Sequence, residues 1–285
     1  MLCYRYMNFQ NAKWSLEDGW FKTSRPSEFN DPFDCRANIK GVPSERVLKE
    51  YVDLNFKRLR ERILLINPAL ANVNIGRGLI LEKLRHRTDW ADEVMTELLE
   101  GCDAVARIIC FSCAAVKDEH SDNLMWGHYA DKGAGVRIGF DLDDLKNTGC
   151  YLFDRVHYDK VMPTFDLSKL KKWPKEGVSE PEFLFKCMYT KDSSWEYEDE
   201  VRMIIPRNHP MHPWMFQERL IEGKKLDFFH LPYSAIRSVD FGVRADIGQC
   251  KKLVASIRSN DKARHISFKR ATLCDDIYGY RFVGL

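Results

Sequence analysis

The sequence predicts an α+β fold, with a mixed, mainly antiparallel sheet, packed helices and a helical insert at about residues 44–105. Short runs rich in β-branched and aromatic residues, typical of strands, lie on both sides of that insert. These runs do not alternate regularly with helices, as they would in a fold built from βαβ units. We therefore expect residues 1–285 to form a single α+β domain.

The N-terminal part of the chain predicts short strands followed by the helical insert. Strands are expected at 2–6 and 20–23, bounded by turn-forming residues. From Ser44, apolar residues recur near the 3.6-residue period of a helix, until Asn67 and Pro68 end the pattern. Further helices are expected at 78–87 and 89–105.

Beyond the insert, strand and helix patterns follow one another in mixed order. The predicted strands lie at 107–114, 133–140, 151–158, 201–205, 226–230, 236–241 and 266–271, and the predicted helices at 121–130, 181–189 and 247–257. Strands on both sides of an insert favour one mixed sheet with helices packed on it.

Composition limits the classes of protein to which the chain can belong. A hydrophobic content of 45% and a charged content of 30% support a packed core. A net charge of +2 gives no general argument for binding nucleic acid or an anionic membrane. There is no apolar run long enough for a membrane span and no signal-peptide pattern, so we expect a cytoplasmic protein with no membrane partner. The nine cysteines are scattered and odd in number, so we expect them to be reduced and mostly buried.

The acidic segment 195–202 carries the most informative pattern in the chain. If it is extended, Glu196, Glu198 and Glu200 point to one face, together with Arg202. Adjacent carboxylates repel one another unless a cation, a donor or a substrate opposes them, so the pattern indicates a site. Burial raises the pKa of Glu200 and Arg202 lowers it, so we expect Glu200 to be ionised near neutral pH. A solvated edge strand is the structural alternative.

Two further segments combine polar and aromatic residues. In 29–35, Asn30 and Asp31 offer polar groups to a ligand, although a rigid turn between two phenylalanines explains the same pattern. In 124–130, His128 and Tyr129 offer a titratable ring and a phenol, and Trp126 offers a stacking surface. A packed core is the alternative for that segment.

No motif indicates a bound metal or a standard hydrolase. The chain has no HExxH, no GxSxG elbow and no P-loop, and its glycine-rich stretch 133–139 opens a strand rather than a helix. We therefore expect no metal cofactor. Basic residues of the insert, among them Lys57, Arg58 and Arg62, predict a solvated helix face or a contact with nucleic acid phosphates.

Several segments together resemble a bacterial family described as a domain of unknown function, number 2971, found near phage-defence and toxin genes. They are 4–6, 20–24, 29–34, 110–112, 124–129, 135–140 and 195–202, and 236–242 is similar as well. The resemblance implies a role as a toxin or anti-phage effector, but it does not specify an activity.

The layout also resembles a diverged ADP-ribosyltransferase, which implies NAD as a substrate. A carboxylate would stabilise the ribosyl cation that forms when the bond to nicotinamide breaks. The implied catalytic residues are Glu200, Glu198 and His128, and Arg5 would face the pyrophosphate. The implied binding residues also include Tyr6, Ser24 (or Ser112), Asn30, Asp31, Trp126, Tyr129 and Arg202. Tyr4 or Tyr6 stands where some such enzymes have histidine.

Two other classes of function remain open. A non-catalytic module that senses a nucleotide or binds a partner would use the same aromatic and acidic residues. A Mg²⁺-dependent nuclease would use Asp31, Asp34 and the glutamates, with the basic insert holding nucleic acid. The expected partners are a small-molecule nucleotide and a protein or nucleic acid target.

Overall fold

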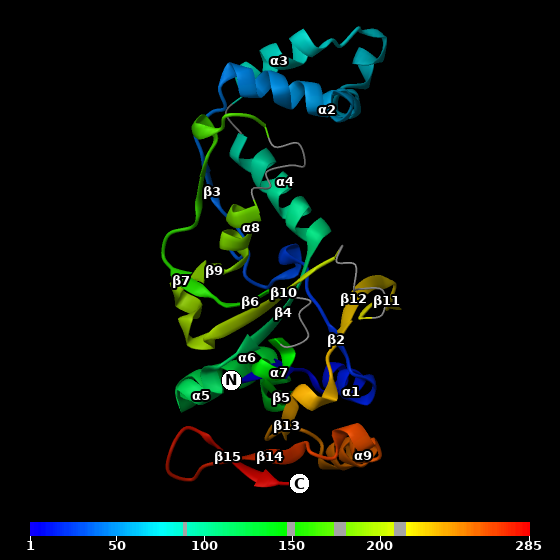
Figure 1. Ribbon diagram of the computed structural model, residues 1–285, viewed down its shortest axis with the longest axis vertical. Coiled ribbons are helices and arrows are strands. Elements are labelled where there is room, and N and C mark those ends of the chain that lie inside the picture. Colours follow the sequence, from blue (N-terminus) through cyan, green and yellow to red (C-terminus); the bar gives the residue numbers. More distant parts are fainter. Residues whose placement is uncertain (88–89, 147–151, 174–180, 208–214) are drawn as a thin grey trace.

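The computed structural model describes residues 1–87, 90–146, 152–173, 181–207 and 215–285. It confirms the α+β fold, with a mixed and mainly antiparallel main sheet (Figure 1). Residues 89 and 151, which begin a predicted helix and a predicted strand, lie outside these ranges. Within the described ranges, none of the helices is long and apolar enough to span a membrane. The single-domain organisation stays a prediction.

The main sheet has eight strands in the order β15-β14-β13-β5-β1-β4-β10-β6. Its described pairs are antiparallel except for β13 and β14, which are parallel. The strands are β1 (Leu2–Met7), β4 (Ala106–Ser112), β5 (Val136–Asp141), β6 (Leu152–Arg155), β10 (Glu200–Pro206), β13 (Ile236–Phe241), β14 (Ser267–Leu273) and β15 (Tyr280–Gly284).

Three smaller sheets flank the main one. They consist of β11 (Phe216–Ile221), β12 (Lys224–His230) and β2 (Trp20–Lys22); of β3 (Asn38–Lys40) and β8 (Thr164–Asp166); and of β7 (His157–Asp159) and β9 (Thr190–Asp192). The predicted strand at 151–158 is thus divided between β6 and β7.

The helical insert predicted at about 44–105 is confirmed, and its first two helices project away from the main sheet (Figure 1). It begins where the Ser44 side chain caps the first helix by accepting from the Val47 N–H. The α-helices of the described chain are α1 (Phe9–Asp18), α2 (Glu45–Ile66), α3 (Arg77–Arg85), α4 (Trp90–Val105), α5 (Ala114–Lys117), α6 (Glu119–Tyr129), α7 (Leu142–Lys146), α8 (Pro181–Met188) and α9 (Ile247–Arg258). Helix α1 was not predicted.

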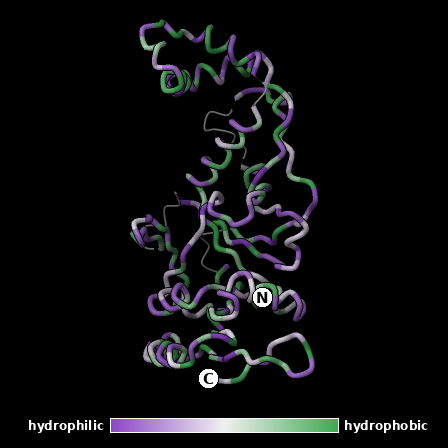
Figure 2. Tube along the Cα trace, turned by 180° about the vertical axis from the view of Figure 1, so that it is seen from behind, coloured by the Kyte–Doolittle hydropathy of each residue, from purple (hydrophilic) through white to green (hydrophobic). Residues whose placement is uncertain are grey.

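Two hydrophobic clusters cover opposite faces of the central strands. In β4, Ile109 belongs to one cluster, whereas its neighbour Ile108 belongs to the other, which also contains the buried residues of the insert. Met203 and Ile204 divide in the same way in β10. Successive side chains of a strand point to opposite faces, so both faces of these strands are buried. Figure 2 shows the resulting hydrophobic segments in the middle of the molecule.

The main sheet opens between β1 and β4. Strand β1 pairs with β5 along its whole length, but the only β1–β4 register within the described residues is Tyr4 opposite Ser112. Further along β4, an isolated bridge joins Ser24 to Ile108 instead. The two strands therefore separate, and the residues that follow β2 enter the opening.

The prediction that all cysteines are reduced is wrong for Cys3 and Cys113, which form a disulfide. They are neighbours of the paired residues Tyr4 and Ser112, so the sheet register brings them together. The other cysteines of the described chain are free, and four of these six are buried. Cys150 lies outside the described residues.

Candidate functional site

A cleft of about 390 Å³ occupies the opening between β1 and β4. Its walls come from β1, β4, α6, the turn at 24–34 and the acidic segment. The structure brings together in this cleft nine of the residues predicted to form a site: Arg5, Tyr6, Ser24, Asn30, His128, Tyr129, Glu198, Glu200 and Arg202. The first and the last of them, Arg5 and Arg202, lie almost two hundred positions apart in the sequence, so the fold assembles the cleft.

The prediction for the acidic segment started from one extended strand, and the structure differs. Residues Ser193–Glu198 form a 3-10 turn, and β10 begins at Glu200. The turn is favoured by Asp192, whose side chain caps it by accepting from the Ser194 N–H, and it ends at Asp199 in the left-handed region (φ 42°). Glu196 is exposed, whereas Glu198 and Glu200 are buried, so the three glutamates do not share a face.

Arg202 is fully buried and is one of the residues that line the cleft. Its guanidinium makes a bidentate ion pair with Asp34, with N–O distances of 2.9 and 2.6 Å. Its Nε donates to Glu200 Oε1 at 2.8 Å, and its Nη2 donates to Glu200 Oε2 at 3.1 Å. Both oxygens of Glu200 are therefore held by the same arginine, as expected for charges that are stable in a protein interior.

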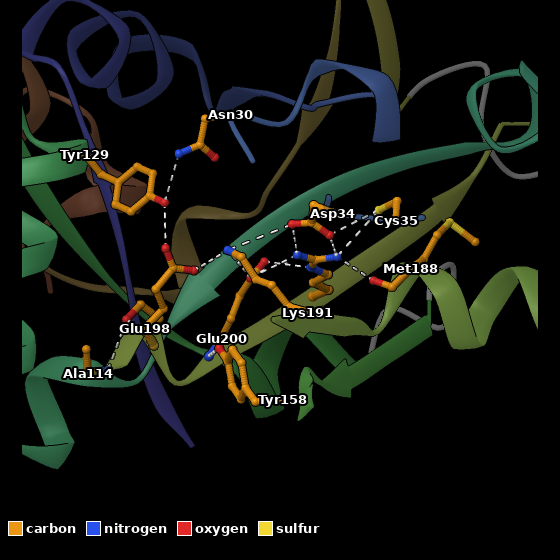
Figure 3. Close-up of polar contacts among 12 residues, drawn as sticks. Asn30, Asp34, Cys35, Ala114, Tyr129, Tyr158, Met188, Lys191, Glu198 and Glu200 are labelled. Atoms are coloured by element: carbon orange, nitrogen blue, oxygen red, sulfur yellow. Dashed lines mark hydrogen bonds and ion pairs between the residues drawn. The ribbon is translucent and has the colours of Figure 1, made fainter. Parts of the chain in front are cut away.

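Lys191, in β9, places a second buried cation among the carboxylates (Figure 3). Its Nζ lies 2.6 Å from Glu198 Oε2, 3.3 Å from Glu200 Oε2 and 3.9 Å from Asp34 Oδ2. Three carboxylates thus surround two cations, Lys191 and Arg202. Because the carboxylates outnumber the cations, the cluster retains an excess of negative formal charge next to the cleft.

Glu198 is the carboxylate that reaches toward the residues of α6 (Figure 3). The Tyr129 hydroxyl donates to Glu198 Oε1 at 2.6 Å, and the Asn30 amide lies 3.4 Å from that hydroxyl. The Glu198 backbone is also fixed, because Ser112 Oγ donates to its carbonyl oxygen. Cys113 N–H donates to Asp199 O at 2.9 Å in the same turn.

The two buried glutamates differ in their proton affinity. Burial alone would raise the pKa of Glu200, but Arg202 and Lys191 lower it to about 2, so Glu200 is ionised, as predicted. Burial raises the pKa of Glu198, Lys191 opposes the rise, and the charge of Glu200 adds to it. Burial and the Glu198 charge raise the pKa of Tyr129, which keeps its hydroxyl protonated as a donor.

Arg5, which is half-buried, differs from the buried arginines of the described chain in having no acidic partner. Arg107 pairs with Asp227, and Arg137 and Arg202 each pair with two carboxylates. Arg5 Nη2 donates to the Lys22 carbonyl at 2.6 Å, but its buried Nη1 has no hydrogen-bond partner in the described chain. Burial lowers the pKa of Arg5 to about 10, so the side chain is still charged at neutral pH. A buried guanidinium without a counter-ion is a favourable place for an anionic ligand group.

His128 lies at the exposed rim of the cleft. Its ring centroid is 6.2 Å from that of Tyr129, 6.5 Å from that of Trp195 and 6.2 Å from that of Tyr197. An imidazole among aromatic rings at the rim is accessible from solvent.

Two predicted binding residues do not line the cleft. Trp126 is 1% exposed and packs in a small cluster, where its ring lies 5.6 Å from that of Tyr6 and Arg137 lies over its face. Asp31 is buried and uses Oδ1 to accept from the Phe33 N–H, as expected of a turn-forming aspartate. The structural alternative therefore explains both residues.

Sequence reasoning missed two members of the cluster, Lys191 as a partner of the glutamates and Asp34 as a partner of Arg202. Lys191 lies between Thr190 and Asp192 and belongs to no recognisable motif. Asp34 was considered only as a ligand for Mg²⁺. Its bidentate pairing with Arg202 spans 168 positions, and no local pattern indicates such a contact.

The comparison with known families agrees with the resemblance found in the sequence. Residues 125–203 match the model of a family described as proteins of unknown function (DUF2971). Residues 125–203 are thus similar to the family that the sequence resembles, and the matched segment contains His128, Tyr129, Lys191, Glu198 and Glu200. No curated protein and no solved structure matches the chain.

Proposed function

We propose that this protein is an NAD-dependent ADP-ribosyltransferase that modifies a macromolecule. One observation carries the proposal: the cleft combines a half-buried arginine, Arg5, that lacks an acidic partner with a carboxylate cluster of excess negative charge. The arginine would bind the anionic pyrophosphate, and the carboxylate cluster would stabilise the ribosyl cation. Tyr6 and Tyr129, which also line the cleft, supply aromatic surface for the nicotinamide ring.

In the proposed reaction, the bond between ribose C1′ and the nicotinamide nitrogen breaks. The bonding electron pair leaves with nicotinamide, and positive charge develops on the ribose as an oxocarbenium ion. A nucleophile of the acceptor then attacks C1′ and loses its proton. A fixed, ionised carboxylate beside the ribose lowers the energy of the cationic transition state.

We assign this contact to Glu198 and a positioning role to Glu200. Both oxygens of Glu200 are held by Arg202, and one also faces Lys191. Glu198 has one cationic partner, Lys191, and one neutral donor, Tyr129. A ribose hydroxyl can replace a neutral donor at lower cost than a buried cation. Glu200 would then hold Lys191 and Arg202 in place behind Glu198.

His128 is the proposed base that takes the proton from the acceptor. It lies at the exposed rim, where a macromolecule can reach it, and histidine exchanges protons near neutral pH. A cytoplasmic toxin or anti-phage effector is the proposed biological role, and growth arrest on expression would test it.

A binding module without catalysis is the second candidate. The observation in its favour is that the carboxylates of Glu198 and Glu200 already have partners within the protein. A nuclease is less favoured, because Arg202 and Lys191 occupy the positions around Asp34 and the glutamates that Mg²⁺ would need, and Asp31 lies outside the cleft. No group of three metal-binding side chains occurs within the described residues.

Release of nicotinamide from NAD tests the proposal. Purified protein, alone and with cell extract, should release nicotinamide and transfer label from the adenine ring of NAD to a macromolecule. Chelation of divalent ions should leave both signals unchanged. NAD binding without release would favour the binding module, and nucleic acid cleavage that needs Mg²⁺ would favour the nuclease.

A further inference from the structure

A second cavity, of about 920 Å³, adjoins the cleft. The two spaces share Arg5, Tyr6, His128 and Tyr129 as lining residues. The second cavity extends from this shared boundary over α1 toward β12 and the turn after β11. Arg5 therefore lies at the boundary between the two spaces, next to a ligand bound in either.

The lining of the second cavity is rich in amide side chains. Gln10, Asn11 and Gln249 all line it, and these three side chains have no hydrogen-bond partner within the described chain. An amide carries both donors and an acceptor, and this combination matches the edges of nucleobases, with adenine as the best-known partner of asparagine and glutamine.

Trp14 supplies a flat surface beside these amides. It lies on α1, lines the second cavity and is 36% exposed, whereas tryptophan side chains are on average highly buried. An exposed indole is a stacking surface for a nucleobase. The charged lining residues balance in number: Arg5 and Lys22 are positive, and Asp131 and Glu222 are negative. A lining without excess charge favours an uncharged heterocycle over a charged peptide.

We propose that the second cavity is a nucleobase subsite, in which a base stacks on Trp14 and bonds to the amides of Gln10, Asn11 and Gln249. The phosphates attached to that base would lie at Arg5, at the boundary with the cleft. This inference rests on the proposed function for the content of the cleft. The base comes either from the second half of the dinucleotide or from a nucleotide of the acceptor.

Calorimetry with adenosine monophosphate, nicotinamide mononucleotide and NAD tests the subsite. Trp14→Leu should weaken the binding of adenosine monophosphate by about tenfold or more, because base stacking is lost. Gln249→Leu should weaken it as well. Neither change should alter the binding of nicotinamide mononucleotide by more than about twofold, since that ligand would occupy only the cleft. Tyr278→Leu is the matched control, because Tyr278 is a 99% exposed aromatic residue that does not line either cavity.

The binding of NAD identifies the source of the base. If the base belongs to the same dinucleotide, NAD binds more tightly than nicotinamide mononucleotide, and Trp14→Leu abolishes the difference. If it belongs to the acceptor, NAD and the mononucleotide bind alike, and adenosine monophosphate still depends on Trp14. The subsite is refuted if Trp14→Leu and Gln249→Leu leave the binding of both adenine ligands unchanged. Absence of binding by NAD and nicotinamide mononucleotide refutes the proposed function instead, whatever adenosine monophosphate does.

Discussion

The Nζ atom of Lys191 lies 2.6 Å from Oε2 of Glu198, and both side chains are buried. The lysine is the only cation within hydrogen-bonding distance of that carboxylate in the described chain. Burial raises the pKa of Glu198, whereas Lys191 opposes the rise. Burial and Lys191 therefore act in opposite directions on the protonation of the proposed catalytic carboxylate.

Replacing Lys191 should change the pH dependence of catalysis. In Lys191→Met, burial and the Glu200 charge act on Glu198 without opposition, so the pKa of Glu198 rises further. The acid limb of the pH–rate profile for nicotinamide release should move to higher pH. Lys191→Arg keeps the charge and should restore much of the wild-type profile. An unchanged acid limb in a folded Lys191→Met protein would show that Lys191 does not control Glu198.

Glu200→Gln should reduce stability, because it leaves Arg202 and Lys191 with fewer negative partners in the interior. Breaking a buried ion pair on one side costs about 3–5 kcal/mol in the free energy of unfolding. Urea denaturation measures the change. Glu196→Gln is the matched control, since Glu196 is exposed and its replacement should cost no more than about 0.5 kcal/mol. Equal stability of the two variants would contradict the structural role of Glu200.

Stability should fall as the solution becomes more acidic. Arg202 and Lys191, opposing the effect of burial, lower the pKa of Glu200 from 4.5 to about 2. A carboxylate whose pKa is lower in the folded than in the unfolded protein stabilises the fold at pH values above the unfolded pKa. This contribution is lost as the pH falls from 4.5 toward about 2. Denaturation midpoints measured through that range should fall less steeply in Glu200→Gln than in wild type. The same slope in both proteins would mean that other carboxylates account for it.

Arg5→Met and Arg202→Met should separate binding from stability. Arg202 is bonded to two buried carboxylates, so its loss should cost about 3–5 kcal/mol in the free energy of unfolding. Arg5 has no acidic partner, so its loss should cost less, about 1.5–3 kcal/mol, for the charged hydrogen bond to the Lys22 carbonyl. Arg5→Met should nevertheless weaken NAD binding by about tenfold or more, as charged hydrogen bonds to phosphate are lost.

Two results would contradict the role of Arg5. One is a loss of stability in Arg5→Met as large as in Arg202→Met, which would make Arg5 a structural residue. The other is unchanged NAD binding in a stable Arg5→Met protein, which would leave the orphan guanidinium without a ligand.

Most of the fold follows from local patterns in the sequence. The start of the insert was predictable because its first helix has a clear 3.6-residue period and ends before Asn67 and Pro68. Helix α1 was not, since it has only ten residues, a length at which a helix depends on its Asn8 cap and on tertiary packing.

The candidate site was predictable in its residues but not in its geometry. Alternating glutamates favour a strand by their spacing, but the cap at Asp192 and the left-handed Asp199 form a turn instead. The pairs of Arg202 with Asp34 and of Tyr129 with Glu198 join distant parts of the chain. Such contacts depend on the sheet order, which the strand patterns leave undetermined. The disulfide between Cys3 and Cys113 has the same origin, because only the β1–β4 register brings the two residues together.

The most direct test of the proposed function is the rate of nicotinamide release by Glu198→Gln at saturating NAD, compared with wild type. The amide keeps the shape of the side chain but removes the charge that would stabilise the ribosyl cation, so the rate should fall by about a hundredfold or more. Binding of NAD should change little, because the lost interaction belongs to the transition state. A folded Glu198→Gln protein that releases nicotinamide at the wild-type rate would contradict the proposal.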